Sequence, residues 1–107
     1  MQVIDLKEMK NFYNSDGVRG QKFHRTELAE IVRLEIQPGA TLKLHKTPVD
    51  VVFYVLAGEG QIQIGDEVHT VGQDMAIESP QMIPHGWTNS GTEPLCLLVI
   101  KLPAPPQ

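Results

Sequence analysis

The feature that most constrains the fold is a succession of short β-patterned segments separated by turn residues. In one of them apolar Val32, Leu34 and Ile36 alternate with charged residues, which is the period of two that a half-buried strand requires. Further segments of this kind are rich in β-branched and apolar residues and cover residues 41–45, 51–56, 61–64, 68–71, 75–77, 85–88 and 95–102. About eight short strands with turns every six to twelve residues predict an antiparallel all-β sandwich or barrel.

The two ends of the chain depart from this pattern. Residues 5–8 have the form of a capping box, which predicts one or two helical turns before the turn residues 14–17. Residues 18–25 fit no single pattern, and the Pro-rich tail 103–107 should be extended or disordered. We therefore expect one domain over residues 1–107, with an N-terminal extension (1–27), a barrel core (about 28–102) and the tail.

Charge and cysteine content exclude several classes of partner. The net charge is −4, and the nine Lys and Arg residues are scattered, so no basic surface for nucleic acid is expected. No apolar run is long enough for a membrane span, and no secretory signal pattern is visible. The single cysteine, Cys96, lies in an apolar run and is expected to be a core residue in a reducing compartment. These features predict a cytoplasmic location.

Two histidines stand on β-patterned segments far apart in the chain. His45 ends the segment 41–45, and His85 begins the segment 85–88. If the two segments pair, the two imidazoles face each other inside one barrel. Of the other histidines, His24 has no recognisable partner and is expected in a solvated loop, and His69 is expected to be a surface or cross-strand residue.

The order and spacing of particular residues in these segments resemble two motifs of the cupins, a family of jelly-roll (double-stranded β-helix) barrels. The resemblance covers about residues 28–102. It rests on the run 53–60 and on Gly39, His45, Gly58, Gly72, Pro80, His85 and Asn89. It implies an all-β cupin barrel with a short N-terminal helical turn.

The resemblance also implies a place for a metal. Cupins that bind iron, manganese, nickel or zinc use three histidines and a glutamate, which correspond here to His45, Thr47, Val51 and His85. Two of four ligands remain, and two histidines contribute roughly 6–8 kcal/mol, or a Kd from micromolar to tens of micromolar. A replacement carboxylate from Asp50 or Glu78 would strengthen such a site, although Asp50 has the wrong strand parity and would need a bulge.

Strand alternation predicts which side chains share the cavity. Lys43 and Thr47 should point the same way as His45, with Lys43 extending to the rim, and Trp87 should do so beside His85. If the glutamate position implied by the resemblance faces inward, Val51, Phe53 and Val55 follow on the next segment. We therefore expect a ligand-binding site formed by His45, Thr47, Phe53, His85 and Trp87, with His45 and His85 as the metal ligands if a metal is bound. The alternative is structural: the histidines hydrogen-bond each other or the backbone, and Phe53 and Trp87 fill the core.

Two functions follow from this site. The first is a binding module that holds a small organic molecule without metal. The second is an enzyme, either a metal-dependent oxygenase, isomerase or lyase with the metal on His45, His85 and a carboxylate, or a metal-free enzyme with the histidines as general acid and base. We favour the first because loss of ligands abolishes catalysis sooner than binding.

Self-association is expected from the face opposite the cavity. Its side chains are too apolar to face water as one patch: Val52, Tyr54, Leu56, Ile62 and Ile64. Together with the resemblance, this predicts a homodimer.

Overall fold

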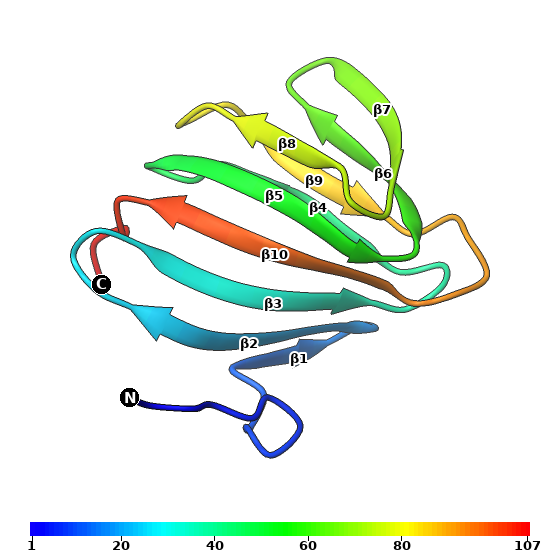
Figure 1. Ribbon diagram of the computed structural model, residues 1–107. Coiled ribbons are helices and arrows are strands. Elements are labelled where there is room, and N and C mark those ends of the chain that lie inside the picture. Colours follow the sequence, from blue (N-terminus) through cyan, green and yellow to red (C-terminus); the bar gives the residue numbers. More distant parts are fainter.

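The computed structural model describes all 107 residues and contains ten strands in two antiparallel sheets (Figure 1). The six-stranded sheet has the order β1 (Tyr13–Ser15), β2 (Val18–Arg25), β3 (Glu30–Ile36), β10 (Leu95–Leu102), β5 (Asp50–Ala57) and β8 (Ala76–Ser79). The four-stranded sheet has the order β4 (Thr41–His45), β9 (His85–Thr88), β6 (Glu59–Ile64) and β7 (Glu67–Gly72). The all-β jelly-roll prediction is therefore confirmed. The structure offers no helix of the length and apolarity that crossing a membrane demands.

The core lies between the two sheets and is built from the inward-facing residue of every second position. On β5 the alternation brings Val51, Phe53 and Val55 inward, and each is at most 1% exposed. On the neighbouring β10, Leu95 and Leu97 are fully buried. Since burial of one such side chain contributes about 1.5–3 kcal/mol, this central strand pair holds the six-stranded sheet against its partner.

The N-terminal region differs from the prediction. Asp5 Oδ1 accepts a hydrogen bond from the Lys7 amide at 2.9 Å, as in a cap, but the segment forms only hydrogen-bonded turns and no helix. The ambiguous residues 18–25 form strand β2, which pairs with β3 along its whole length. Gln21 fixes the turns to this strand, because its Nε2 donates to the carbonyls of Leu6 and Met9 at 2.7 and 2.9 Å. The sheet thus extends into the segment that we expected to lie outside the barrel core.

Strand β4 contains an irregularity that changes which residues face inward. It pairs with β9 through Leu42↔Trp87 and His45↔His85, and the register shifts between these two pairs. Leu42 therefore packs against the core, whereas Lys43 is exposed. The prediction that Lys43 points into the cavity with His45 is wrong, because strict alternation does not survive a bulge.

The face opposite the cavity is smaller than predicted. Ile62 is 2% exposed and belongs to the core, and Ile64 packs against that core. Val52, Tyr54 and Leu56 remain on the outer face of β5, half-buried. Two of the five side chains assigned to a dimer interface are thus unavailable for it, and the homodimer stays a prediction.

Two motif residues fix the turns next to the core. Gly58 links β5 to β6 with a φ of +84°, and a Cβ at this position would lie 2.4 Å from the Pro94 carbonyl oxygen. Asn89 is fully buried, and its Nδ2 donates to the carbonyls of Ile36 and Glu93 at 2.9 and 2.8 Å. Asn89 thereby joins the turn after β9 to the end of β3.

Candidate functional site

The two histidines predicted to meet lie side by side in the barrel. His45 on β4 and His85 on β9 are cross-strand partners, and their ring centroids are 4.7 Å apart with an interplanar angle of 82°. The rings thus share one environment, and the predicted pairing of the two segments is confirmed. Their degree of burial differs: His85 is 2% exposed and therefore buried, whereas His45 is an exposed residue.

Both ring nitrogens of His85 are engaged by hydroxyl groups. Ser79 Oγ lies 2.7 Å from Nδ1, and Thr47 Oγ1 lies 3.1 Å from Nε2. Burial lowers the pKa of His85 to about 4, and the nearby His45 and Lys101 act in the same direction. The ring is therefore neutral near pH 7, so one hydroxyl donates to its bare nitrogen and the other accepts from its N–H.

His45 lines the cavity and has a hydrogen-bond partner in the protein at only one of its ring nitrogens. Its Nδ1 lies 3.0 Å from the Lys43 carbonyl oxygen. A carbonyl can only accept, so Nδ1 carries a hydrogen, and in the neutral ring Nε2 has a free lone pair. His45 can therefore accept a hydrogen bond, or a proton, from a molecule in the cavity.

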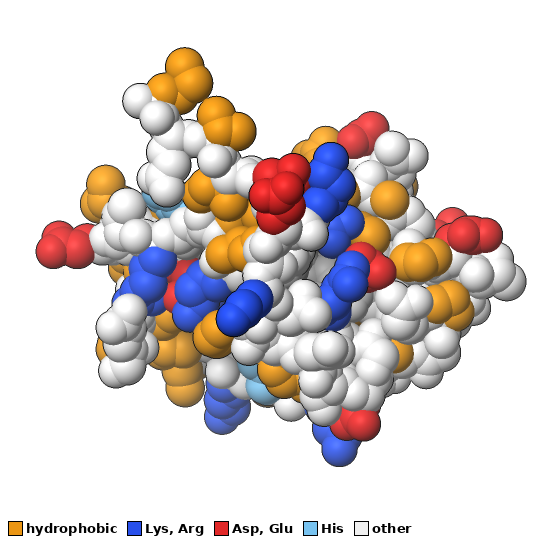
Figure 2. All heavy atoms as spheres, turned by 90° about the horizontal axis from the view of Figure 1, so that it is seen from below, with side chains coloured by type: hydrophobic (Ala, Val, Ile, Leu, Met, Phe, Trp, Pro, Cys, Tyr) orange, Lys and Arg blue, Asp and Glu red, His pale blue; other side chains and the backbone are white.

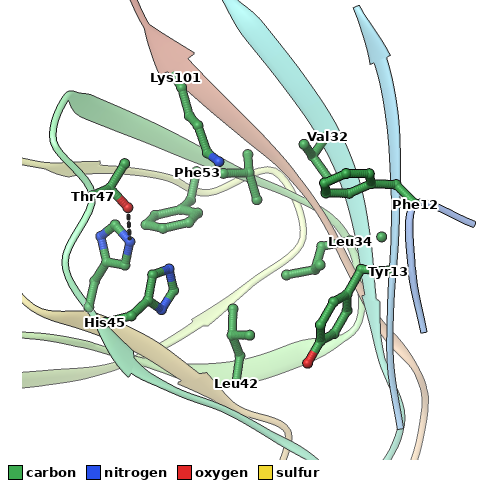
Figure 3. A pocket seen from close by; sticks show the side chains of 12 residues that line it. Phe12, Tyr13, Val32, Leu34, Leu42, His45, Thr47, Phe53 and Lys101 are labelled. Carbon is green, nitrogen blue, oxygen red and sulfur yellow. Dashed lines mark hydrogen bonds between the residues drawn. The ribbon is translucent and has the colours of Figure 1, made fainter. Parts of the chain in front are cut away.

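The cavity has a volume of about 270 Å³, at the small end of ligand sites. Its polar groups come from His45, Thr47, His85 and Lys101 and from the hydroxyl of Tyr13. The rest of its wall is mainly apolar or aromatic and consists of Phe12, Tyr13, Val32, Leu34, Leu42, Phe53 and Val99, with Gly20 between them. Figure 3 shows His45 and Thr47 on one side of this space and Phe12 and Tyr13 across it.

The two aromatic residues predicted for the site have different positions. Phe53 lines the cavity, and its ring centroid is 5.1 Å from that of His85. Trp87 does not reach the cavity. It is buried beside Phe53, with ring centroids 5.4 Å apart, and its Nε1 is the only buried side-chain polar atom without a hydrogen-bond partner. The predicted role of Trp87 as a cavity wall is therefore corrected to a core role that supports Phe53.

The residues at this site do not fit a metal centre. No group of three or more His, Cys, Asp or Glu side chains in the chain is placed to hold an ion. Asp50 is exposed and accepts a hydrogen bond from the Gln81 amide at 2.8 Å, and Glu78 is exposed on β8. Neither carboxylate replaces the missing ligands, and Thr47 occupies the Nε2 side of His85.

Several cavity residues escape the sequence reasoning. Phe12 and Tyr13 belong to the segment for which we expected helical turns. Strict alternation from His45 places Leu42 on the face of its strand opposite to the cavity. Ser79 has the sequence signature of a strand break only, although it binds His85. The inward position of Lys101, near the end of β10, could have been predicted from the sequence, because Lys101 alternates in step with Leu95, Leu97 and Val99.

Comparison with known proteins assigns the family. The sequence profile of the cupin domain matches residues 32–101, and the chain belongs to the cupin family. The protein TT1209 from Thermus thermophilus is similar over 98% of this chain and 100% of its own, with 30% identity and a TM-score of 0.83. No protein of curated function matches the sequence significantly.

Two more distant structures share the fold. The polyketide cyclase RemF from Streptomyces resistomycificus has 19% identity and a TM-score of 0.85, over 100% of this chain and 82% of its own. KdgF from Halomonas sp. has 17% identity and a TM-score of 0.83, over 92% and 91%.

Proposed function

We propose that this cupin binds a small organic molecule in the cavity between its sheets, without a metal. The observation that carries the proposal is the contrast between the two histidines. His85 is neutral and has both nitrogens engaged, whereas His45 lines an apolar space of about 270 Å³ and has a hydrogen-bond partner in the protein only at Nδ1. A concave apolar site with a few polar groups is the usual form of a small-molecule site.

His45 and Phe53 have distinct parts in this proposal. His45 Nε2 accepts a hydrogen bond from a hydroxyl or N–H of the ligand and fixes its orientation. Phe53, held from behind by Trp87, provides a flat apolar surface for the body of the ligand. The Thr47–His85–Ser79 chain keeps the floor of the cavity satisfied without ligand, so the site is formed before binding.

The test is a ligand screen by NMR with a matched pair of variants on one strand. Leu42→Trp fills the cavity from β4, and Leu44→Trp places the same side chain on an exposed position of β4. Compounds that bind the wild type and Leu44→Trp should not bind Leu42→Trp. Hits that persist equally in both variants bind elsewhere, and the proposal then fails.

A second function, metal-free acid–base catalysis, is favoured by one observation. The Lys43 carbonyl holds the His45 ring in the tautomer whose Nε2 is a free base, as a positioning group does for a catalytic histidine. Prolonged incubation with a ligand found in the screen distinguishes the two functions. Conversion that is lost in His45→Gln indicates catalysis, and unchanged ligand indicates binding alone.

A further inference from the structure

A buried carboxylate with three cations adjoins the cavity through one of them, Lys101. Glu30, on the inward face of β3, is 2% exposed. Its Oε1 contacts Lys22 Nζ at 3.1 Å and Arg25 Nη1 at 2.7 Å, and its Oε2 contacts Lys101 Nζ at 3.1 Å. Burial alone would raise the pKa of Glu30, but hydrogen bonds from these three cations outweigh it and lower the pKa to about 2. Glu30 is therefore charged under all ordinary conditions.

The cluster has more positive than negative charge. One carboxylate faces three cations, which leaves a surplus of two positive charges. Arg25 also donates to the Pro105 carbonyl at 2.6 Å, and Lys22 lies 4.1 Å from the ring centroid of Phe12. Each of these two cations thus has a second partner in the protein. Lys101 has only Glu30, although an ammonium group has three donors.

Lys101 is also the cation of this cluster that lines the cavity. It has the inward parity of β10 and lines the cavity together with His45 and His85. Figure 3 shows its nitrogen end directed inward beside Phe53. Its side chain is 26% exposed, so its charge is screened less than that of a surface lysine. Lys and Arg side chains also gather among hydrophobic groups on the face seen in Figure 2.

Most polar groups of the cavity lie on one side. Lys101, His45 and Thr47 lie there together with Phe53, while Val32, Leu34 and the two aromatic residues of the N-terminal segment line the facing wall, where the Tyr13 hydroxyl is the polar group (Figure 3). An occupant that satisfies both walls has a charged end and an apolar body. A single available ammonium in so small a space suits a carboxylate better than a phosphate, which takes several donors.

We propose that the ligand of this cavity is a small carboxylic acid whose carboxylate binds Lys101 Nζ and whose apolar body packs between Phe53 and the facing wall. This inference rests on the proposed small-molecule function. Glu30 positions Lys101 at the cavity, and the charge of Glu30 is neutralised by Lys22 and Arg25. An incoming carboxylate therefore meets a net positive charge.

The experiment compares matched acids and amides. The probes are 3-phenylpropanoic acid with 3-phenylpropanamide, and hexanoic acid with hexanamide, titrated by NMR in a buffer free of carboxylates. The variants are Lys101→Met and Lys101→Arg, with Lys43→Met as the control because Lys43 is exposed on β4. Chemical shifts of residues around the cavity report the place of binding.

We expect the wild type to bind each acid about 10-fold or more tightly than its amide, which corresponds to about 1.4 kcal/mol. Lys101→Met should lose this preference and still bind the amide, which also shows that the cavity is intact. Lys101→Arg should keep part of the preference, and Lys43→Met all of it.

The possible failures are distinguishable. Equal binding of acid and amide to the wild type overturns the carboxylate inference and leaves the small-molecule function standing. A preference that survives in Lys101→Met also overturns it, because another group then selects the anion. Binding of no member of either pair at the cavity contradicts the inference, whereas the broader ligand screen decides the function independently.

Discussion

The neutral, buried His85 predicts a steep loss of stability in mild acid. A histidine in an unfolded chain has a pKa near 6.5, whereas the pKa of His85 in the fold is about 4. Below pH 6.5 the unfolded state binds a proton that the folded state does not. The stability that this group contributes is therefore complete above pH 6.5 and is lost as the pH falls toward 4.

The magnitude follows from the pKa difference. Each pKa unit corresponds to about 1.36 kcal/mol, so the full loss is about 3 kcal/mol, of which about 2 kcal/mol is reached at pH 5. His85 is 2% exposed, and solvent screening therefore does not reduce this value much. For a domain of this size, about 2 kcal/mol is a large part of the total stability of roughly 5–15 kcal/mol.

The assay is urea unfolding followed by the fluorescence of Trp87, the single tryptophan, between about pH 7.5 and pH 5. The slope of the free energy of unfolding should approach about 1.4 kcal/mol per pH unit near pH 5.5. His85→Gln should lose stability at neutral pH and have a much smaller slope. His69→Gln, which removes an exposed ring on β7, is the control and should keep the wild-type slope. An equal slope in wild type and His85→Gln would refute the reasoning.

Three further predictions concern other parts of the molecule. Glu30→Gln leaves three cations without their buried counter-ion and should destabilise the fold by about 3–5 kcal/mol. Chemical denaturation measures this loss, and a value under about 1 kcal/mol would contradict a stabilising role of the ion cluster. The double variant Thr47→His/Val51→Glu restores the ligand types of metal-binding cupins and should purify with a divalent metal that the untagged wild type lacks. The metal content of both purified proteins is measured, and an equal metal content counts against the metal-free site. Gly58→Ala should lower the free energy of unfolding by more than the roughly 1–2 kcal/mol that a left-handed backbone costs, because the new Cβ meets a carbonyl oxygen. Gly39→Ala also has a positive φ but open space around it, so its loss should not exceed that amount. Equal losses of stability in thermal unfolding would show that the close contact at residue 58 relaxes.

The amino-acid sequence by itself determined most of the strands and the inward face of β3. Alternation over 32–36 fixed the inward residues of β3, because a strand with one buried face needs a period of two. The apolar run 51–56 indicated a buried strand, but not which of its faces lies inward. The spacing of motif residues around His45 and His85 also determined that the two rings meet. The absence of a complete ligand set was visible in the same way, since Thr47 and Val51 stand at two ligand positions.

Only the tertiary structure decided which side chains form the rest of the cavity. The register shift in β4 turned Leu42 inward and Lys43 outward. This shift was not predicted, because no local sequence pattern in this segment indicates a bulge. The sequence did not predict strand β2, because a strand is stabilised by its partner, here β3, as much as by the propensity of its own residues. The Glu30–Lys101 contact joins residues brought together only when β3 pairs with β10. Sequence patterns report the burial of a segment along the chain, whereas cavity chemistry depends on contacts between strands that are distant in sequence.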